Sequence, residues 1–142
     1  MRRHIAALLT SVAIVACNAA EPMYQANSTD DGASFQLQVV EIDRRGNRST
    51  ISVPGFHQRT AAGSRWLMCI FNDLALKRGF KYWLVVYPEE PNETFPIALY
   101  HSPQDDLLAI LGDEYADDRA FPPASEPMST DMWSQSLCAW KK

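Results

Sequence analysis

Residues 66–88, WLMCIFNDLALKRGFKYWLVVYP, carry most of the information about the fold. In the first half of this stretch, apolar side chains recur at helical spacing, at Leu67, Ile70, Phe71 and Leu74. Polar side chains occupy mainly the opposite side, at Arg65, Asn72, Asp73 and Lys77. The pattern predicts an amphipathic helix that begins after Thr60 or Ser64, either of which is a suitable N-cap.

The predicted helix ends at Gly79. Lys77 and Arg78 put positive charge at its C-terminus, where the helix dipole favours it, and glycine readily adopts the left-handed conformation found just past a helix. Residues 80–87 then carry mainly aromatic and β-branched side chains on both alternating faces, which is typical of a central strand covered on both sides. Pro88 ends this strand, because proline has no backbone N–H to donate.

Shorter strands are predicted before and after this unit. Residues 35–42 and 48–53 have the pattern of a hairpin whose loop is about five residues long. Residues 94–101 are predicted to form a further strand. Pro96 indicates that this last strand lies at an edge of the sheet or contains a bulge.

Two short helices are predicted nearer the C-terminus. Ser102 is the N-cap of the first, which ends at Gly112, and the second begins near Ser129 or Thr130, after a long loop. The predicted fold class is therefore α+β, with a small antiparallel sheet in ββαββ order, the central helix packed on it, and one or two short C-terminal helices. We expect residues 34–142 to form a single domain, because 142 residues with 46% hydrophobic and 21% charged content is ordinary composition for one domain.

Charge is distributed unevenly along the chain. Residues 34–88 contain eight Lys or Arg and three Asp or Glu, whereas residues 89–142 contain three Lys or Arg and eleven Asp or Glu. One interpretation is that the two halves neutralise each other or carry solvated faces. The other is an acidic C-terminal surface that attracts a basic partner and repels nucleic acid and anionic lipid, so we expect no binding to nucleic acid.

The N-terminus has the layout of a secretory signal peptide. A basic start precedes residues 5–16, an uncharged and mostly apolar run that is too short to span a bilayer permanently. Residues 14–17, IVAC, resemble the lipobox of bacterial lipoproteins. The resemblance implies that residues 1–16 are removed and that acyl chains on Cys17 anchor the protein in a membrane. By the sorting pattern of that family, Asn18 implies the outer membrane, with the protein facing the periplasm.

An ordinary signal peptide is the alternative. Cleavage around Ala19 or Ala20 would discard Cys17 and leave a secreted or soluble periplasmic protein. After the cysteine the sequence is small and polar and has no periodic pattern. We therefore expect residues 17–33 to be the lipidated cysteine and a flexible tether.

The other two cysteines, Cys69 and Cys138, are expected to form a disulfide. They are an even pair, and disulfides persist in the cell envelope. Such a bond closes a loop of about 70 residues and is worth roughly 4 kcal/mol in chain-entropy models. The alternative is a reactive or metal-binding thiol, which needs a histidine or a second cysteine close by.

The sequence contains no recognisable catalytic motif. Once Cys17 is the N-terminus, only His57 and His101 remain as histidines, and neither has zinc-binding spacing. The paired carboxylates lack the spacing of a calcium-binding loop. An envelope hydrolase would require a cleft where one of these histidines meets the carboxylates near Asp113. We expect instead a protein that is not an enzyme and holds no metal or cofactor.

The candidate partner-binding residues are acidic or aromatic: Asp113, Glu114, Asp117, Asp118 and Trp140. The carboxylates lie in the predicted long loop, and Trp140 stands beside the charged C-terminus. The alternatives are that the carboxylates are simply solvated and that the aromatic side chains pack in the core.

The helix-to-strand turn loosely resembles that of small uncharacterised envelope lipoproteins of Gram-negative bacteria, at Leu74, Ala75, Gly79, Phe80, Tyr82 and Trp83. That resemblance implies no activity. We expect a non-enzymatic protein, lipid-anchored in the outer membrane, that binds another envelope protein or supports an assembly. A more specific hypothesis is an immunity-type or inhibitor lipoprotein whose acidic half neutralises a basic toxin or hydrolase.

Overall fold

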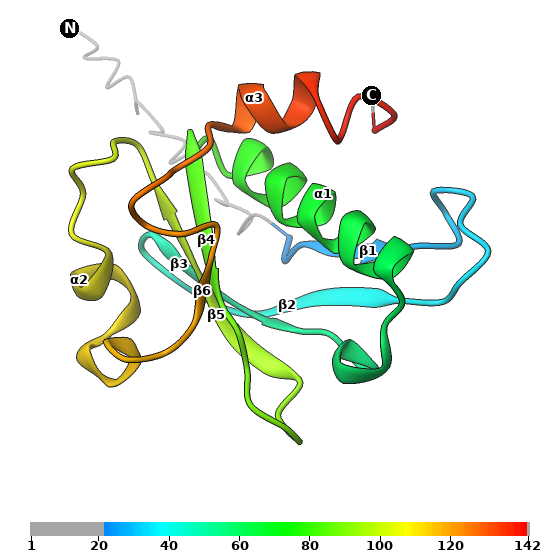
Figure 1. The fold of residues 1–142 in the computed structure, drawn as a ribbon, viewed down its shortest axis with the longest axis horizontal. Helices are drawn as coiled ribbons and strands as arrows, with labels where there is room; N and C mark the ends of the chain where they lie inside the picture. Colours follow the sequence, from blue (N-terminus) through cyan, green and yellow to red (C-terminus); the bar gives the residue numbers. More distant parts are fainter. Residues whose placement is uncertain (1–21, 142) are drawn as a thin grey trace, which may run out of the picture.

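The computed structural model describes residues 22–141, and the predicted signal peptide, residues 1–16, and Cys17 lie outside this range. Within it, six antiparallel strands form one sheet in the order β1-β2-β3-β5-β4-β6 (Figure 1). The strands are β1 Gln25–Asn27, β2 Gln38–Arg45, β3 Arg48–Ser52, β4 Tyr82–Val86, β5 Thr94–Tyr100 and β6 Ala120–Phe121. The helices are α1 Ala61–Lys77, α2 Leu107–Leu111 and α3 Thr130–Gln135, with 3-10 helices η1 at Phe56–Gln58 and η2 at Asp113–Tyr115. The predicted α+β class is confirmed.

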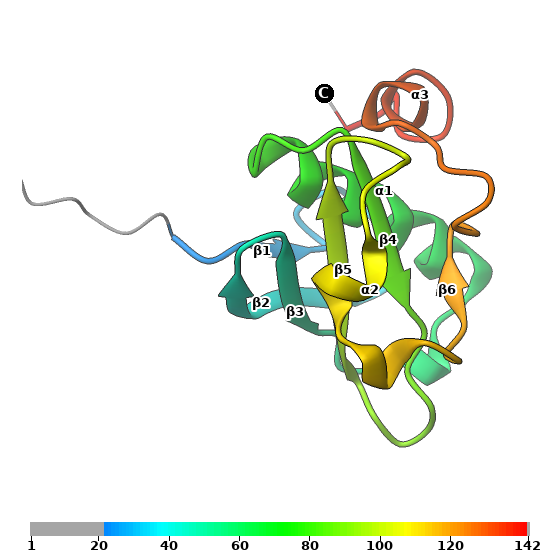
Figure 2. The same cartoon turned by 90° about the vertical axis from the view of Figure 1, so that its left-hand side faces the viewer.

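The helices lie on both faces of the sheet. α1 crosses one face with α3 beside it, and α2 lies over the other face (Figures 1 and 2). Successive residues of β4 contribute to the two faces in turn: Trp83 and Val85 pack in the cluster under α1, and Leu84 and Val86 pack in the cluster under α2. The predicted burial of this strand on both sides is therefore confirmed.

Both ends of α1 are as predicted. Thr60 is the N-cap, and its side chain accepts a hydrogen bond from the backbone N–H of Gly63. At the other end Gly79 has a φ of 80°, and the backbone N–H of Phe80 donates to the carbonyl of Ala75. This bond belongs to the Schellman motif, which satisfies carbonyls that the last helical turn leaves without partners.

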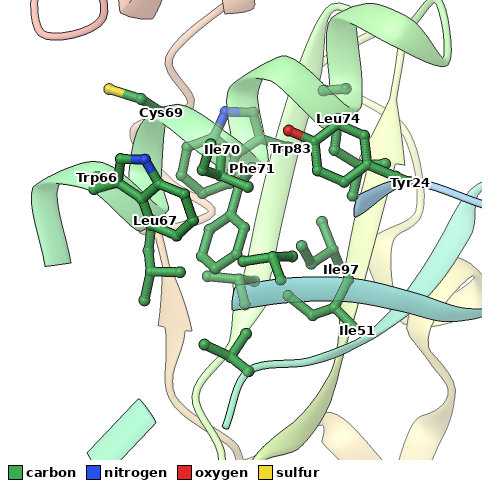
Figure 3. Close-up of a cluster of buried hydrophobic side chains, with 14 of the residues drawn as sticks. Tyr24, Ile51, Trp66, Leu67, Cys69, Ile70, Phe71, Leu74, Trp83 and Ile97 are labelled. Atoms are coloured by element: carbon green, nitrogen blue, oxygen red, sulfur yellow. The ribbon is translucent and has the colours of Figure 1, made fainter. Parts of the chain in front are cut away.

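The core under α1 comes largely from residues 66–88. Figure 3 shows the apolar side of the helix facing the sheet, with Trp66, Leu67, Ile70, Phe71 and Leu74 opposite Ile51, Trp83 and Ile97. Asn72 lies on the side of the helix opposite the apolar stripe, as the pattern indicates, but α3 covers that side and buries it. The Asn72 amide donates to the Thr130 carbonyl and accepts from Trp83 Nε1, so the buried polar group is satisfied.

The hairpin of β2 and β3 is tighter than predicted. Its turn consists of Gly46 and Asn47 rather than five residues, because Arg45 already pairs with Arg48. Gly46 has a φ of 54°, which the two-residue turn requires. A bulge between Glu41 and Asp43 shifts the register of the pairing.

The prediction that β5 is an edge strand or bulged is wrong, because β5 pairs with β3 on one side and β4 on the other. The carbonyl of Tyr100 accepts a hydrogen bond from the backbone N–H of Lys81, just before β4. Because backbone polar groups alternate in direction along a strand, the even-numbered residues of β5 direct theirs towards β4. The ladder with β4 ends at Ile97. Pro96 lies one residue beyond that end, where its missing N–H breaks no ladder bond.

The segment after β5 differs from the prediction in two ways. α2 begins after Asp106, whose carboxylate accepts from the N–H of Ala109, rather than after Ser102. The Asp105 carboxylate accepts from the N–H groups of His101 and Ser102, which holds this part of the chain in a turn. In addition, the predicted long loop contains η2 and the short strand β6. α3 begins after Ser129, as predicted.

The tether prediction is wrong for the part that the structure describes, residues 22–33. This part contains β1, and the buried Tyr24 donates from its hydroxyl to Asp73 Oδ2 at 2.7 Å. Asp31 accepts from Trp66 Nε1 at 2.8 Å and forms an ion pair with Lys141. The ordered part of the chain therefore starts at least twelve residues before residue 34, and only residues 18–21 of the expected tether lie outside the described range.

Cys69 and Cys138 lie at disulfide distance, with their Sγ atoms 2.13 Å apart. The bond joins α1 to the segment that follows α3, across a sequence separation of 69 residues. It fixes the C-terminal segment against the side of α1 that faces away from the sheet, where α3 also packs (Figure 1).

Candidate functional site

Four of the predicted partner-binding residues form one exposed segment between α2 and β6. We call Asp113, Glu114, Asp117 and Asp118 the acidic segment; all four side chains are exposed. Among residues 22–141, the ion pairs involve other carboxylates, and none of these four takes part in one. The acidic segment therefore carries charge that the rest of the described chain does not neutralise by direct contact.

A hollow of about 590 Å³ adjoins the acidic segment at the end of β4. Asp117 and Asp118 line it together with Arg59 and Tyr87. The guanidinium of Arg59 stacks on the ring of Phe56, 3.8 Å from its centroid, and burial lowers the pKa of Arg59. Burial raises the pKa of the Tyr87 hydroxyl, although the charge of Arg59 opposes this rise. The hollow combines both signs of charge around aromatic rings, so it favours neither anions nor cations by charge alone.

His57 also lines this hollow, but its ring nitrogens have partners elsewhere. Its Nε2 lies 2.8 Å from the carbonyl oxygen of Asn92, and its Nδ1 lies 3.7 Å from a carboxylate oxygen of Glu90. A general base needs a ring nitrogen directed at the reacting group. The structure thus places His57 in one hollow with two of the carboxylates, in an orientation that does not present a nitrogen to them.

His101 lies at the other end of β4 and does not meet the acidic segment. Its ring stacks on Phe80, with the centroids 4.7 Å apart, and its backbone N–H donates to Asp105. The cleft that a hydrolase would require is therefore not formed by His101. Within residues 22–141, no group of three or more His, Cys, Asp or Glu side chains is placed to hold a metal ion.

Trp140, the fifth predicted residue, is 50% exposed and lies apart from the acidic segment. It lines a hollow of about 360 Å³ together with Phe35, Trp66 and Leu137. This hollow lies between the start of α1 and the C-terminal segment, whereas the acidic segment follows α2 on the opposite side of the sheet (Figures 1 and 2). The structure therefore separates the predicted residues into two distinct surfaces.

Sequence reasoning missed a group of cations beside the start of the described chain. We call Arg44, Arg45, Lys77 and Arg78 the basic end. Arg44 donates to the carbonyl of Pro22, and Arg78 donates to the carbonyl of Gly46 in the β2–β3 turn. Lys77 lies over the ring of Tyr24, 5.2 Å from its centroid. The excess of Lys and Arg in residues 34–88 was the available signal, but their gathering depends on the hairpin and the end of α1 meeting in space.

One carboxylate at the basic end is buried and structural. Glu41 accepts hydrogen bonds from the Arg44 guanidinium, the Ser49 hydroxyl and the backbone N–H of Tyr24. Burial alone would raise the pKa of Glu41, but these hydrogen bonds and the charge of Arg44 outweigh it and lower the pKa. Glu41 thereby joins β1, β2 and β3 around one satisfied charge.

No helix in the described part of the chain is long and apolar enough to cross a membrane. Comparisons of the chain with protein-family models, with curated proteins and with solved structures found no match.

Proposed function

We propose that this chain is a lipoprotein anchored in the bacterial outer membrane, facing the periplasm, that binds another envelope protein without catalysing a reaction. The resemblance of residues 14–17 to a lipobox supports the anchor, because acyl chains on Cys17 would hold a protein that has no spanning helix in residues 22–141. Binding through a protein surface needs no catalytic group, and Nε2 of His57 lies against the carbonyl oxygen of Asn92 rather than against a carboxylate of the acidic segment.

The observation that carries the binding role is the acidic segment. Its four carboxylates are exposed, adjacent and without an ion pair in the described chain. Such a surface gains from meeting a basic partner, through faster encounter and complementary charge, while it costs the fold little. The partner is therefore a protein with a basic surface.

Crosslinking in cells, followed by purification of the full-length chain at low and at high salt, tests this proposal. The informative variant neutralises the acidic segment: Asp113→Asn, Glu114→Gln, Asp117→Asn and Asp118→Asn. A matched control removes the same number of exposed carboxylates elsewhere: Asp30→Asn, Glu90→Gln, Glu126→Gln and Asp131→Asn. We expect one stoichiometric partner that is lost at high salt and in the first variant but kept in the control.

Two results would contradict the proposal separately. Equal recovery of the partner by both variants would exclude the acidic segment as the binding surface. An intact mass of the mature protein without the acyl chains would exclude the anchor, and Cys17→Ser provides the reference mass and the untethered comparison. These two outcomes are independent of each other.

An immunity-type or inhibitor role is a second candidate, and the position of the acidic segment favours it. Asp117 and Asp118 line a hollow that also contains Arg59 and Tyr87, so a basic toxin or hydrolase that covered the acidic segment would also contact a concave surface with an aromatic ring. Protection of cells from a purified basic toxin by the natural chain, and its loss in the acidic-segment variant, would distinguish this role from a structural one.

A further inference from the structure

The described chain begins very close to the proposed lipid anchor. Pro22 follows Cys17 by five residues, and a chain of that length spans at most about 18 Å, whatever its conformation. A domain of some 120 residues has a radius of gyration of about 14 Å. A tether this short keeps the part of the domain around Pro22 within about 18 Å of the membrane surface if Cys17 is acylated, so this part is the one best placed to touch the bilayer.

The part of the domain around Pro22 is the basic end. The carbonyl of Pro22 accepts from Arg44, and a hollow of about 380 Å³ beside it is also lined by Met23, Lys77 and Arg78. In Figure 2 the described chain enters at β1, next to the turn that joins β2 and β3. The described chain therefore begins beside these cations.

The cations at the basic end project further into solvent than the carboxylates that pair with them. The side chain of Arg45 is 77% exposed and that of its partner Asp43 42%, and the side chain of Lys77 is 64% exposed and that of Asp73 21%. Glu41, the partner of Arg44, is buried. Although these pairs are formally neutral, the outermost groups are positive. Two large apolar side chains are also exposed in this part of the chain: Met23, which lines the same hollow, and Leu76, which precedes Lys77 in the sequence.

This combination matches the surface of a membrane. Lys and Arg near a bilayer are attracted to anionic headgroups, and apolar side chains next to them enter the interface. Asp117 and Asp118, in the second half of the acidic segment, lie away from the same surface. The carbonyl of Arg119, which follows the acidic segment, accepts a hydrogen bond from the N–H of Tyr87, just past the last residue of β4. The C-terminus of α1 lies near the first residue of β4, at the opposite end of that strand. Charge therefore favours one orientation of the domain over the reverse.

We propose that the basic end, together with Met23 and Leu76, is a docking surface for anionic phospholipid headgroups of the bilayer that carries the anchor. The docked domain rests on the membrane with β1 and the β2–β3 turn towards it. The acidic segment then points into the aqueous space, where a partner reaches it. This inference rests on the proposed acylation of Cys17.

The experiment compares the reactivity of two lysines on the same helix. The full-length chain is produced in a Gram-negative host, its intact mass is measured, and it is reconstituted in vesicles of phosphatidylethanolamine and phosphatidylglycerol. Lys77 is the reporter, and Arg65→Lys supplies a reference lysine near the start of α1, twelve residues away, or about 18 Å along the helix. Both lysines are labelled with an amine-reactive reagent, and mass spectrometry measures the rate of labelling at each. We expect Lys77 to react about fivefold more slowly than in detergent, and the reference lysine to react at nearly its detergent rate.

Charge variants identify the cause of the protection. Arg45→Glu at the basic end should restore most of the Lys77 rate, as should vesicles of neutral phosphatidylcholine. Arg119→Glu makes the same change of charge beside the acidic segment and should leave Lys77 protected. An acylated protein in which Lys77 and the reference lysine react alike, or in which Arg45→Glu has no effect, overturns the docking surface while the anchor stands. A mature mass without acyl chains overturns the anchor, and with it the orientation.

Discussion

The two faces of the sheet differ in how firmly the helices that cover them are held. Under α1, a large cluster of buried side chains is closed by a helix of 17 residues and by the disulfide between Cys69 and Cys138. On the other face, α2, a helix of five residues, covers four buried side chains of the sheet and adds its own Leu111 to the cluster, and the acidic segment follows it. On one face of the sheet, side chains are therefore buried and stabilise the fold. On the other, the acidic segment carries exposed charge that can bind a partner.

Because the sequence contains no recognisable catalytic motif, this difference indicates which residues to test for function. Residues of the first face are held by several contacts each, so changing them tests stability. Residues of the acidic segment make few contacts, so changing them tests recognition. We therefore expect substitutions under α1 to reduce stability most and substitutions in the acidic segment to reduce it least.

The largest loss of stability should come from removing the disulfide. Replacing both cysteines, Cys69→Ala with Cys138→Ala, frees a loop that spans 69 residues and should lower the free energy of unfolding by about 4 kcal/mol. Urea denaturation with and without a reducing agent measures this effect. The double variant should not respond to the reducing agent, and a natural chain whose stability is equally indifferent to reduction would contradict the prediction.

Truncating one leucine on each face compares the two cores directly. Leu74→Ala removes a fully buried side chain from the cluster under α1 and should cost about 3 kcal/mol of unfolding free energy. Leu111→Ala makes the same chemical change in the smaller cluster under α2, where neighbours can move into the space, and should cost about 2 kcal/mol. Denaturant midpoints of the two variants give the order, and the reverse order would show that α2 is the more rigid cover.

The α1 face was also the more predictable one from sequence. The N-cap at Thr60 and the stop at Gly79 depend on local hydrogen bonds within a few residues, and both are correct. The buried position of Asn72 depends on α3, which is far away in sequence, and the periodicity of α1 contains no information about it. Similarly, β1 is ordered by polar contacts of Tyr24 and Asp31 with distant residues, which composition does not reveal.

The acidic segment shows the same limit for a site. Its residue types indicate a charged surface, and their exposure agrees with that expectation. The sequence does not predict that Trp140 lies elsewhere, nor that Arg59 and Tyr87 share a hollow with Asp117, because these positions are set by how η1, β4 and β6 meet. Local patterns predict the elements, and tertiary packing decides which side chains become neighbours.

Glu41 is a buried carboxylate and can be compared with the exposed carboxylates of the acidic segment. Glu41→Gln keeps the shape but loses the charge that accepts from Arg44 and Ser49, and should cost about 2 kcal/mol near neutral pH. The folded pKa of Glu41 lies below its unfolded value, so its contribution to stability is complete above the unfolded pKa. It is lost as the pH falls through the folded pKa. The difference in unfolding free energy between the natural chain and Glu41→Gln should therefore shrink below about pH 4.

The control for Glu41 is a single carboxylate of the acidic segment. Asp117→Asn changes the charge equally but removes no ion pair within residues 22–141. The free energy of unfolding of Asp117→Asn should stay close to that of the natural chain across the same pH range. If the difference in unfolding free energy between Glu41→Gln and the natural chain does not depend on pH, then Glu41 stabilises the fold by packing rather than by charge.

The smallest effect on stability should come from neutralising the whole acidic segment. Asn and Gln at all four positions should change the free energy of unfolding by less than about 0.5 kcal/mol, because exposed side chains without ion pairs contribute little to the fold. The same variant should lose the partner that high salt also removes. Together, unchanged denaturation and lost binding would assign the charge of this surface to recognition. A clear loss of stability would instead mean that the acidic segment helps to hold α2 on the sheet, and the contrast between the two faces would then be one of degree.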